Sequence, residues 1–271
     1  MPKILLFIPM YNCQKQISRV LDQLGAEAGA WFDEAIIVNN RSTDGGEQAV
    51  IERLARGDLP CRASLLRNRE NYGLGGSHKV AFAYAMEHGF DYVVVLHGDD
   101  QGHLEDLLPV LASGAYLKYD CCLGARFMRG SRLEGYSRFR TFGNVVYNLL
   151  FSAVTGRRVY DLGSGLNLYR VASLGKRYYQ AFCDNLQFNY CMVLALSYLR
   201  QKALFFPIRW SEDDQVSNVK LTRQAVNVIK LLGRYVVSPR RFMASELRET
   251  PRESYQADVI AAAAGHGGGC V

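Results

Sequence analysis

Short apolar runs and segments of helical periodicity alternate along the first hundred residues. The apolar runs have the length and continuity of strands buried on both faces, and they comprise residues 4–9, 35–40, 64–66 and 92–98. Between them, apolar residues recur every three or four positions over residues 17–24, 48–54 and 77–89. Because strands that alternate with helices are joined by right-handed crossovers, this pattern predicts a mostly parallel α/β sheet.

The second half of the chain has a mixed pattern. It predicts strands at residues 121–124, 166–169 and 204–208, and helices at residues 104–111, 145–154, 186–199 and 220–237. The final segment, residues 246–271, contains AAAAGHGGG near its end, and this run of small residues predicts a disordered tail. We therefore expect one folded domain over residues 1–245.

Polar clusters follow each of the four N-terminal strands. They lie at residues 11–12, 39–44, 71–79 and 97–101. In an open parallel sheet, ligands bind in the crevice beyond the carboxyl ends of the strands. We therefore expect the four clusters to line one cleft.

Composition excludes several classes of protein. Apolar residues make up 49% and charged residues 21% of the 271 residues, which excludes a disordered, collagen-like or disulfide-scaffold chain. The 32 Lys and Arg exceed the 26 Asp and Glu by six, an excess that suits a phosphate-bearing partner or an anionic surface. Seven scattered cysteines without Cys-x-x-Cys spacing favour a reducing, cytoplasmic compartment, and no apolar stretch reaches the ~20 residues of a membrane span.

An acidic turn closes the fourth predicted strand, in the sequence LHGDDQ. It places Asp99, Asp100 and Gln101 together, with His97 two positions before Asp99. Mg²⁺ and Mn²⁺ take oxygen ligands, usually one or two carboxylates together with the phosphates of a substrate. The turn is thus a candidate metal–diphosphate site, with Asp99 as the first choice. Alternatively, the two Asp only form a turn and cap the helix at residues 104–111.

Five motifs in register carry a resemblance to a known family. They are IPMYN, VNNRSTDGG, NYGLGGSHK, LHGDDQ and DLGSGLNLYR. Together they resemble the inverting family 2 glycosyltransferases of GT-A fold, and within these the dolichol- and polyprenyl-phosphate sugar transferases. The resemblance spans residues 3–237. It implies a nucleotide-binding half over residues 1–111, a mixed acceptor half over residues 112–245, and a Rossmann-like sheet with helices on both faces.

The resemblance implies a set of residues that bind a nucleoside-diphosphate sugar. By position they are Pro9, Tyr11, Asn12, Asn39, Asn40, Asn71, Gly76, Lys79, Gly98, Asp99, Ser164 and Gly165. At Asn39 and Asn40 the family usually has one or two Asp, one of which accepts a hydrogen bond from the base. Because an amide donates as well as accepts, the choice between uracil and guanine stays open. NYGLGGSHK lacks the Gly-x-x-x-x-Gly-Lys-Ser/Thr pattern of a phosphate loop, which disfavours an ATPase.

The resemblance also implies a metal site and groups that act on the leaving diphosphate. Asp99 and Gln101 keep the second Asp and the Gln of the family's metal motif, while His97 stands at the first Asp. His97 is then either a softer metal ligand or a strand-end histidine with a structural role. Arg209 and Lys220 match a late segment whose cations hold the donor diphosphate during catalysis.

The resemblance also implies that three arginines and one carboxylate act on the acceptor, the molecule that receives the sugar. Arg126, Arg138 and Arg140 match arginines that face an acceptor phosphate, although Arg138 and Arg140 also fit a solvated basic loop. Asp184 stands near the family's catalytic general base. With a hydroxyl acceptor it would accept the proton, whereas with a lipid phosphate, already an anion, it would bind or orient the sugar. A structural alternative makes Asp184 the N-cap of the following helix.

Three hypotheses follow for the function. In the first, an inverting, Mg²⁺- or Mn²⁺-dependent glycosyltransferase moves a sugar to a polyprenyl phosphate at the cytoplasmic face of a membrane. In the second, the acceptor is a hydroxyl on a glycan or small metabolite, with Asp184 as base. In the third, the chain binds nucleotide sugars without catalysis, because Asn39, Asn40 and His97 replace carboxylates. Nucleic acid is not an expected partner.

Two segments favour a peripheral position on a membrane surface. Residues 219–237 predict a basic amphipathic helix, and the apolar residues 145–154 lie between Arg140 and Arg157. Such helices lie in the interface of anionic membranes, but they also pack on protein cores.

Overall fold

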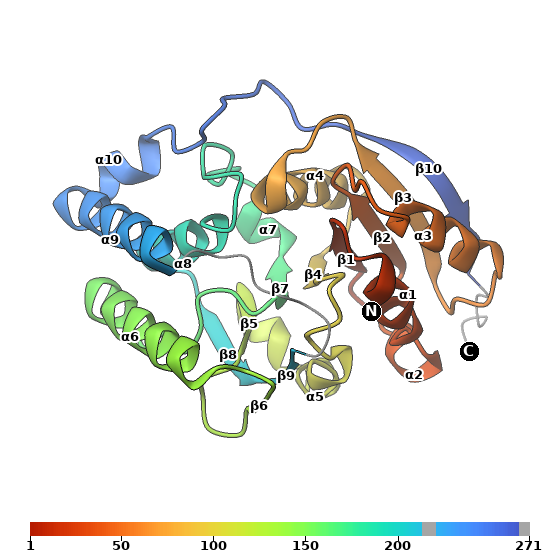
Figure 1. Cartoon of the computed structure of the whole chain (residues 1–271), viewed down its shortest axis with the longest axis horizontal. Coiled ribbons are helices and arrows are strands. Elements are labelled where there is room, and N and C mark those ends of the chain that lie inside the picture. The colour runs from red at the N-terminus through yellow and green to blue at the C-terminus, as the bar shows by residue number, and fades with distance from the viewer. Residues whose placement is uncertain (213–220, 266–271) are drawn as a thin grey trace.

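Eight strands form the central sheet of the molecule (Figure 1). The computed structural model describes residues 1–212 and 221–265, and within these the strand order is β10-β3-β2-β1-β4-β7-β5-β8. The strands are β1 (Ile4–Met10), β2 (Glu34–Asn39), β3 (Arg62–Asn68), β4 (Tyr92–Leu96), β5 (Cys121–Ala125), β7 (Leu166–Arg170), β8 (Ala203–Pro207) and β10 (Ala257–Ala263).

The strands at the centre of the sheet run parallel. β1 pairs in parallel with β2 and β4, β2 with β3, and β5 with β8, whereas β7 runs antiparallel between β4 and β5. A separate two-stranded sheet pairs β6 (Arg132–Glu134) with β9 (Arg209–Ser211). The predicted α/β class, mostly parallel in the first half of the chain and mixed in the second, is confirmed.

Helices lie on both faces of the sheet (Figure 1). The described α-helices are α1 (Gln14–Asp22), α2 (Ala26–Gly29), α3 (Gly46–Ala55), α4 (Gly73–Glu87), α5 (Leu108–Ala112), α6 (Arg138–Thr155), α7 (Val171–Leu174), α8 (Phe188–Tyr198), α9 (Leu221–Val237) and α10 (Pro239–Ala244), with short 3₁₀ turns at Leu104–Asp106 and Ala115–Lys118. α6 begins seven residues earlier than predicted, because its first two turns contain no buried residue and so show no apolar stripe that faces the core.

The alternation of side chains along β1 divides the core into two layers. Leu5 and Phe7 point to the face covered by α4 and α8, while Ile4, Leu6 and Ile8 point to the face covered by α1 and α3. Successive side chains of a strand point to opposite faces, so a central strand covered on both sides must be apolar throughout. This explains why all seven residues of β1 are buried.

The interpretation of residues 246–271 as a disordered tail is wrong for residues 246–265. Residues 246–256 cross the molecule from α10, and β10 then pairs antiparallel with the edge strand β3, from Ala257 opposite Asn68 to Ala263 opposite Ala63 (Figure 1). Backbone groups make these hydrogen bonds, so an alanine-rich segment can complete a sheet although its composition suggests disorder. Residues 266–271 lie outside the described part of the chain.

Candidate active site

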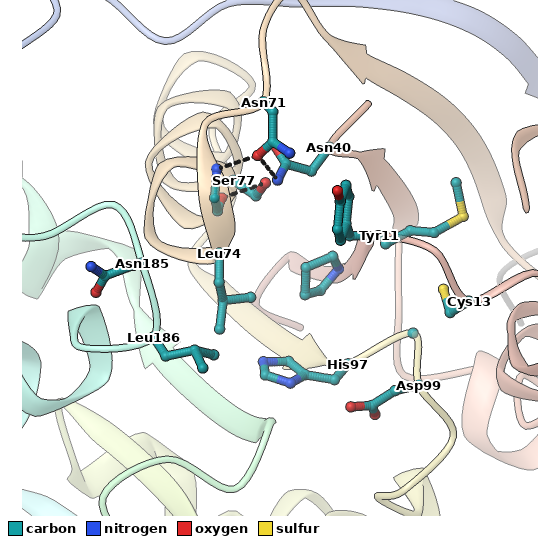
Figure 2. Close-up of a pocket in the computed structure, with 14 residues that line it drawn as sticks. Tyr11, Cys13, Asn40, Asn71, Leu74, Ser77, His97, Asp99, Asn185 and Leu186 are labelled. Carbon is teal, nitrogen blue, oxygen red and sulfur yellow. Dashed lines mark hydrogen bonds between the residues drawn. The ribbon is translucent and has the colours of Figure 1, made fainter. Parts of the chain in front are cut away.

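A cavity of about 380 Å³ lies at the carboxyl ends of β1 and β4. Figure 2 shows Asn40, Asn71 and Ser77 on one side of it and His97 and Asp99 on the opposite side. The lining residues are Pro9, Met10, Tyr11, Cys13, Asn40, Asn71, Gly73, Leu74, Ser77, His97, Gly98, Asp99, Asn185 and Leu186. The polar clusters after all four N-terminal strands contribute residues to or around this cavity, as expected for an open parallel sheet.

The side-chain amides of Asn39 and Asn40 form hydrogen bonds with other residues of the protein. Asn40 donates from Nδ2 to Asn71 Oδ1 at 2.8 Å, and its Oδ1 accepts from Asn68 Nδ2 at 3.0 Å and from the Tyr72 backbone at 2.8 Å. Asn39 donates to Glu47 at 2.7 Å and does not line the cavity. Both residues therefore fix the loops around the cavity.

Asn12 is exposed and does not line the cavity. Its backbone NH donates to Ser42 Oγ at 3.1 Å, and its side-chain oxygen accepts from the Thr43 NH at 2.8 Å. These bonds join the turn after β1 to the turn after β2. Of the residues predicted around the end of β1, Pro9 in the strand and Tyr11 in the turn line the cavity, and Asn12 positions this turn.

The two acidic residues of the LHGDDQ turn have different environments. Asp100 accepts from Arg19 Nε at 2.6 Å and from Gln23 Nε2 at 3.1 Å, which anchors the turn to α1. Asp99 lies in the cavity wall, and desolvation raises the pKa of its carboxyl group to about 6. Neither side chain caps the 3₁₀ turn at Leu104–Asp106, whose N-cap is His103. The alternative interpretation as a helix cap is therefore wrong.

His97 forms the floor of the cavity next to Gly165. Its backbone NH donates to Gly165 O at 3.0 Å, and burial lowers the pKa of the imidazole to about 4, so the ring is neutral near pH 7. Gly165 has φ +78°, and a Cβ there would lie 2.7 Å from His97 Cγ. Only glycine fits this position without strain. Ser164 is fully buried behind it and does not line the cavity.

The donor set of the cavity wall fits one divalent cation held jointly with a ligand. Among residues 1–212 and 221–265, no three His, Cys, Asp or Glu side chains are grouped so as to hold a metal ion by themselves. Asp99 nevertheless presents a desolvated carboxylate, and His97 Nε2 is buried without a hydrogen-bond partner in the described part of the protein. Mg²⁺ and Mn²⁺ commonly take one or two protein ligands and complete their shell with phosphate oxygens. The side chain of Gln101 does not line the cavity.

Two residues expected beside the nucleotide face away from the cavity. Lys79 is fully buried on α4, and its Nζ donates to Asp184 Oδ1 and to Phe182 O, both at 2.6 Å. Gly76 packs against Tyr72 and Tyr255, where a Cβ would lie 2.3 Å from Tyr72 Cβ. The predicted nucleotide contacts of Gly76 and Lys79 are therefore corrected, because both residues lie on the side of α4 that faces away from the cavity.

Asp184 also lies behind the cavity wall. Its carboxylate accepts from Lys79, from Tyr255 OH at 2.7 Å and from Arg252 Nη1 at 3.0 Å. The N-cap of α8 is Gln187, so the capping alternative for Asp184 is wrong. The next two residues, Asn185 and Leu186, do line the cavity.

Three of the basic residues predicted to face phosphates are held by acidic side chains. Arg126 forms a buried bidentate pair with Asp161, with Nε–Oδ2 at 2.8 Å and Nη2–Oδ1 at 2.9 Å. Arg140 pairs with Glu212 at 2.6 Å, and Arg209 pairs with Asp106 and Glu105. Arg138 is exposed at the start of α6. Lys220 lies outside the described residues.

Several cavity residues carry no strong sequence signal. Cys13, Leu74, Ser77, Asn185 and Leu186 line the cavity, but they are residue types common in ordinary turns and helices. Leu74 and Ser77 lie within the Gly-rich segment, and Asn185 and Leu186 follow Asp184. Their closeness in sequence to these predicted site residues is the signal that could have indicated them.

Solved glycosyltransferases share this fold. The superposition on glucosyl-3-phosphoglycerate synthase from M. tuberculosis has a TM-score of 0.57 at 15% identity and covers 85% of this chain and 80% of the other. TarS from S. aureus, solved with UDP-GlcNAc, gives 0.56 at 20% identity over 87% of this chain and 67% of the other. The fold is therefore the GT-A fold of nucleotide-sugar transferases.

Sequence comparison identifies the family within this fold. The model of glycosyl transferase family 2 matches residues 6–177, and the chain belongs to this family. It is 24% identical over 172 residues to the undecaprenyl-phosphate mannosyltransferase of Micrococcus luteus, an alignment that covers 64% of this chain and 68% of the relative. It is 29% identical over 170 residues to the undecaprenyl-phosphate 4-deoxy-4-formamido-L-arabinose transferase of Photorhabdus laumondii, covering 62% of this chain and 49% of that protein. The chain thus aligns with about half the length of this second relative.

Proposed function

We propose that this protein is an inverting glycosyltransferase that moves a sugar from a nucleoside-diphosphate donor to a polyprenyl-phosphate acceptor. The observation that carries the proposal is the cavity at the carboxyl ends of β1 and β4, whose wall presents the Asp99 carboxylate. Membership of family 2 and similarity to two undecaprenyl-phosphate sugar transferases support it.

The donor would bind with its base among Pro9, Tyr11 and Asn71 and its diphosphate at Asp99 and His97. Asp99 and His97 Nε2 would hold Mg²⁺ or Mn²⁺ together with phosphate oxygens, and the ion would neutralise the charge on the leaving diphosphate. A phosphate oxygen of the acceptor would attack the anomeric carbon from the opposite side, which inverts the configuration.

The hydrogen bonds that Asp184 accepts within the protein favour a phosphate over a hydroxyl as the acceptor group. A hydroxyl nucleophile needs a base within hydrogen-bond reach, and both Asp184 oxygens already accept bonds from Lys79, Tyr255 and Arg252 behind the cavity wall. A phosphate monoester is an anion near neutral pH and needs no base. Of the three arginines predicted to face the acceptor, Arg126 and Arg140 are paired with carboxylates, whereas Arg138 is exposed at the start of α6 and could attract the phosphate.

Two neighbouring helices support a membrane-bound acceptor. α6 and α9 contact each other and lie side by side in Figure 1. Each has an exposed apolar stripe, made of Phe139, Phe142, Val146 and Leu149 on α6 and of Val226, Ile229, Val236 and Val237 on α9. α9 also packs on the protein, because its Val228, Leu232 and Tyr235 are buried in the core on another side of the helix.

We propose that this exposed apolar surface docks on the cytoplasmic face of a membrane. Exposed Arg138, Arg157 and Arg158 lie at the ends of α6, and Lys230 and Arg234 are exposed on α9, as expected for binding to anionic lipids. In the described part of the chain, no helix is both long and apolar enough to cross a bilayer.

A screen of nucleoside diphosphates tests the donor. We expect UDP or GDP with Mn²⁺ to raise the unfolding temperature of the full chain, because a ligand that binds only the folded state stabilises it by mass action. CMP, ADP and Mn²⁺ alone serve as controls. The absence of a shift with any nucleoside diphosphate at millimolar concentration would contradict a nucleotide-sugar donor.

Sedimentation with lipid vesicles tests the membrane surface. We expect the full chain to bind vesicles that contain anionic lipids, and Leu149→Ser or Ile229→Ser to weaken binding about tenfold, since each loses one inserted side chain worth about 1–2 kcal/mol. Leu117→Ser, which removes an exposed leucine outside both helices, is the control and should bind like the wild type. Equal binding by all four proteins would exclude α6 and α9 as the docking surface.

A further inference from the structure

The C-terminal crossing segment, residues 246–256, is fastened to the molecule at both ends. Near its start, the Leu247 NH donates to Ala181 O at 2.8 Å. At its end, Gln256 O accepts from the Arg69 NH at 3.0 Å, and β10 then joins the sheet. Figure 1 shows the segment running past the end of α4 between α10 and β10. The segment therefore spans the side of α4 opposite the cavity.

Two side chains of the crossing segment reach Asp184. Tyr255 OH donates to Asp184 Oδ1 at 2.7 Å and lies 3.1 Å from Lys79 Nζ, and Arg252 Nη1 donates to Asp184 Oδ2 at 3.0 Å. The Asp184 side chain is 14% exposed and that of Lys79 is 0% exposed. Charge-assisted hydrogen bonds in such a desolvated place are stronger than those at the surface. The carboxylate is thus held from both sides.

The backbone of Asp184 is held by α4. Asp184 O accepts from the Gly75 NH at 2.7 Å and from the Gly76 NH at 3.4 Å. A Cβ at Gly73 would lie 2.5 Å from Asp184 O, and one at Gly75 would lie 2.4 Å from Cys183 O. The glycines of NYGLGGSHK therefore allow the loop at residues 183–187 to contact the first turn of α4 directly.

This loop forms one wall of the cavity. Asn185 and Leu186 line it, and Leu186 is 54% exposed, so few neighbouring side chains restrain it on the cavity side (Figure 2). Its position depends on the hydrogen bonds of Asp184 behind the wall and on a longer one, 3.4 Å, from Asn185 Nδ2 to Glu249 in the crossing segment. Within the loop, the Gln187 NH also donates to Asn185 Oδ1 at 2.9 Å. A displacement of the crossing segment would therefore move Asn185 and Leu186.

We propose that Tyr255 and Arg252 are positioning residues that set the cavity wall through Asp184, so that the crossing segment controls how tightly a nucleoside diphosphate binds. Asp184 then couples the two regions mechanically, because its side chain binds the crossing segment and its chain neighbours Asn185 and Leu186 line the cavity. The effect on nucleotide affinity rests on the proposed function, whereas the effect on the loop at residues 183–187 does not.

Three variants and one control test this inference in the full chain. Tyr255→Phe removes only the hydroxyl group, Arg252→Gln removes the charge, and Arg252→Lys restores it. The control is Arg69→Gln, because Arg69 pairs with Asp258 and Gln256 further along the same stretch but does not contact Asp184. All four are compared with the wild type by thermal unfolding, by amide hydrogen exchange without ligand, and by calorimetric titration with UDP or GDP and Mn²⁺.

We expect Tyr255→Phe and Arg252→Gln to speed amide exchange at residues 185–187 and to weaken nucleotide binding about three- to tenfold, the size of effect expected for loss of one ordinary hydrogen bond. Arg252→Lys should recover most of the affinity, and Arg69→Gln should leave both readouts at wild-type values. Unchanged exchange at residues 185–187 in both Asp184-contacting variants, or an equal change in Arg69→Gln, would overturn the inference. Faster exchange in a protein whose wild type binds no nucleotide would overturn the proposed function instead and leave the mechanical link in place.

Discussion

Asp99→Asn is expected to reduce sugar transfer at least about a hundredfold while it stabilises the folded protein. The amide keeps the size and shape of the carboxyl group but removes the negative charge that would hold the cation on the leaving diphosphate, and losses of this order follow removal of such electrostatic groups. Transfer from a radiolabelled nucleotide sugar to a polyprenyl phosphate, assayed with Mn²⁺, measures the first effect.

The stabilisation follows from the pKa of Asp99. Burial raises this pKa from 3.8 to about 6, so the folded protein binds the proton more tightly than the unfolded chain does. The stability therefore falls as the pH rises through this interval, and above pH 6 the ionised carboxylate costs the fold on the order of 1–3 kcal/mol. Asp99→Asn should recover this free energy at pH 7, and its advantage over the wild type should shrink as the pH is lowered toward 5.

The neighbouring carboxylate provides the matched control. Asp100 pairs with Arg19 and Gln23, so Asp100→Asn should lower the unfolding temperature slightly and keep most of the activity. If Asp99→Asn transferred sugar at the wild-type rate, or if Asp100→Asn were the inactive variant, the assignment of Asp99 to the diphosphate site would be wrong.

Arg126→Met is expected to lower the free energy of unfolding by about 3–5 kcal/mol. The side chains of Arg126 and Asp161 are 11% and 2% exposed, and Arg126 also donates to Gly163 O at 3.1 Å. Removing the guanidinium group leaves the Asp161 carboxylate buried without its counter-ion. The guanidinium group also lies 4.8 Å from the centre of the Trp210 ring, so a cation–π contact is lost as well. Urea unfolding monitored by circular dichroism measures the change.

This result would separate two roles for Arg126. If Arg126 is a structural partner of Asp161, it holds the loop at residues 161–165 next to His97, and removal of the guanidinium group destabilises the protein. As a ligand of an acceptor phosphate, its loss would raise the KM for the acceptor and leave stability unchanged. Arg138→Met, at an exposed position, should change stability by less than about 0.5 kcal/mol. Equal stability of both variants would contradict the structural role.

The features that could be predicted from sequence depend on residues close together in the chain. The apolar runs predict β1, β2 and β4 because a strand buried on both faces must be apolar throughout. The carboxyl ends of parallel strands lie at the same edge of a sheet, so residues at these ends are expected around one cavity. Pro9, Tyr11, Asn40, Asn71 and Asp99 line it.

The features that could not be predicted depend on distant partners. The residues around an arginine do not show whether a distant carboxylate pairs with it. The pairing of Arg126 with Asp161, 35 residues later, therefore could not be predicted from the sequence. Lys79 and Asp184 are 105 residues apart, and Tyr255 reaches Asp184 from a segment whose composition suggests disorder. In each case the tertiary structure decides whether a charged group faces a ligand or another side chain.

The pairing of β10 with β3 has a consequence for biosynthesis. Of the eight strands in the described sheet, β10 leaves the ribosome last, yet it covers the outer edge of a strand that emerges nearly two hundred residues earlier. During translation the nascent chain therefore exposes the unpaired backbone of β3, the kind of edge that recruits other strands and leads to aggregation. Chaperone dependence of this protein should thus be greatest after β3 has left the ribosome and before β10 has emerged.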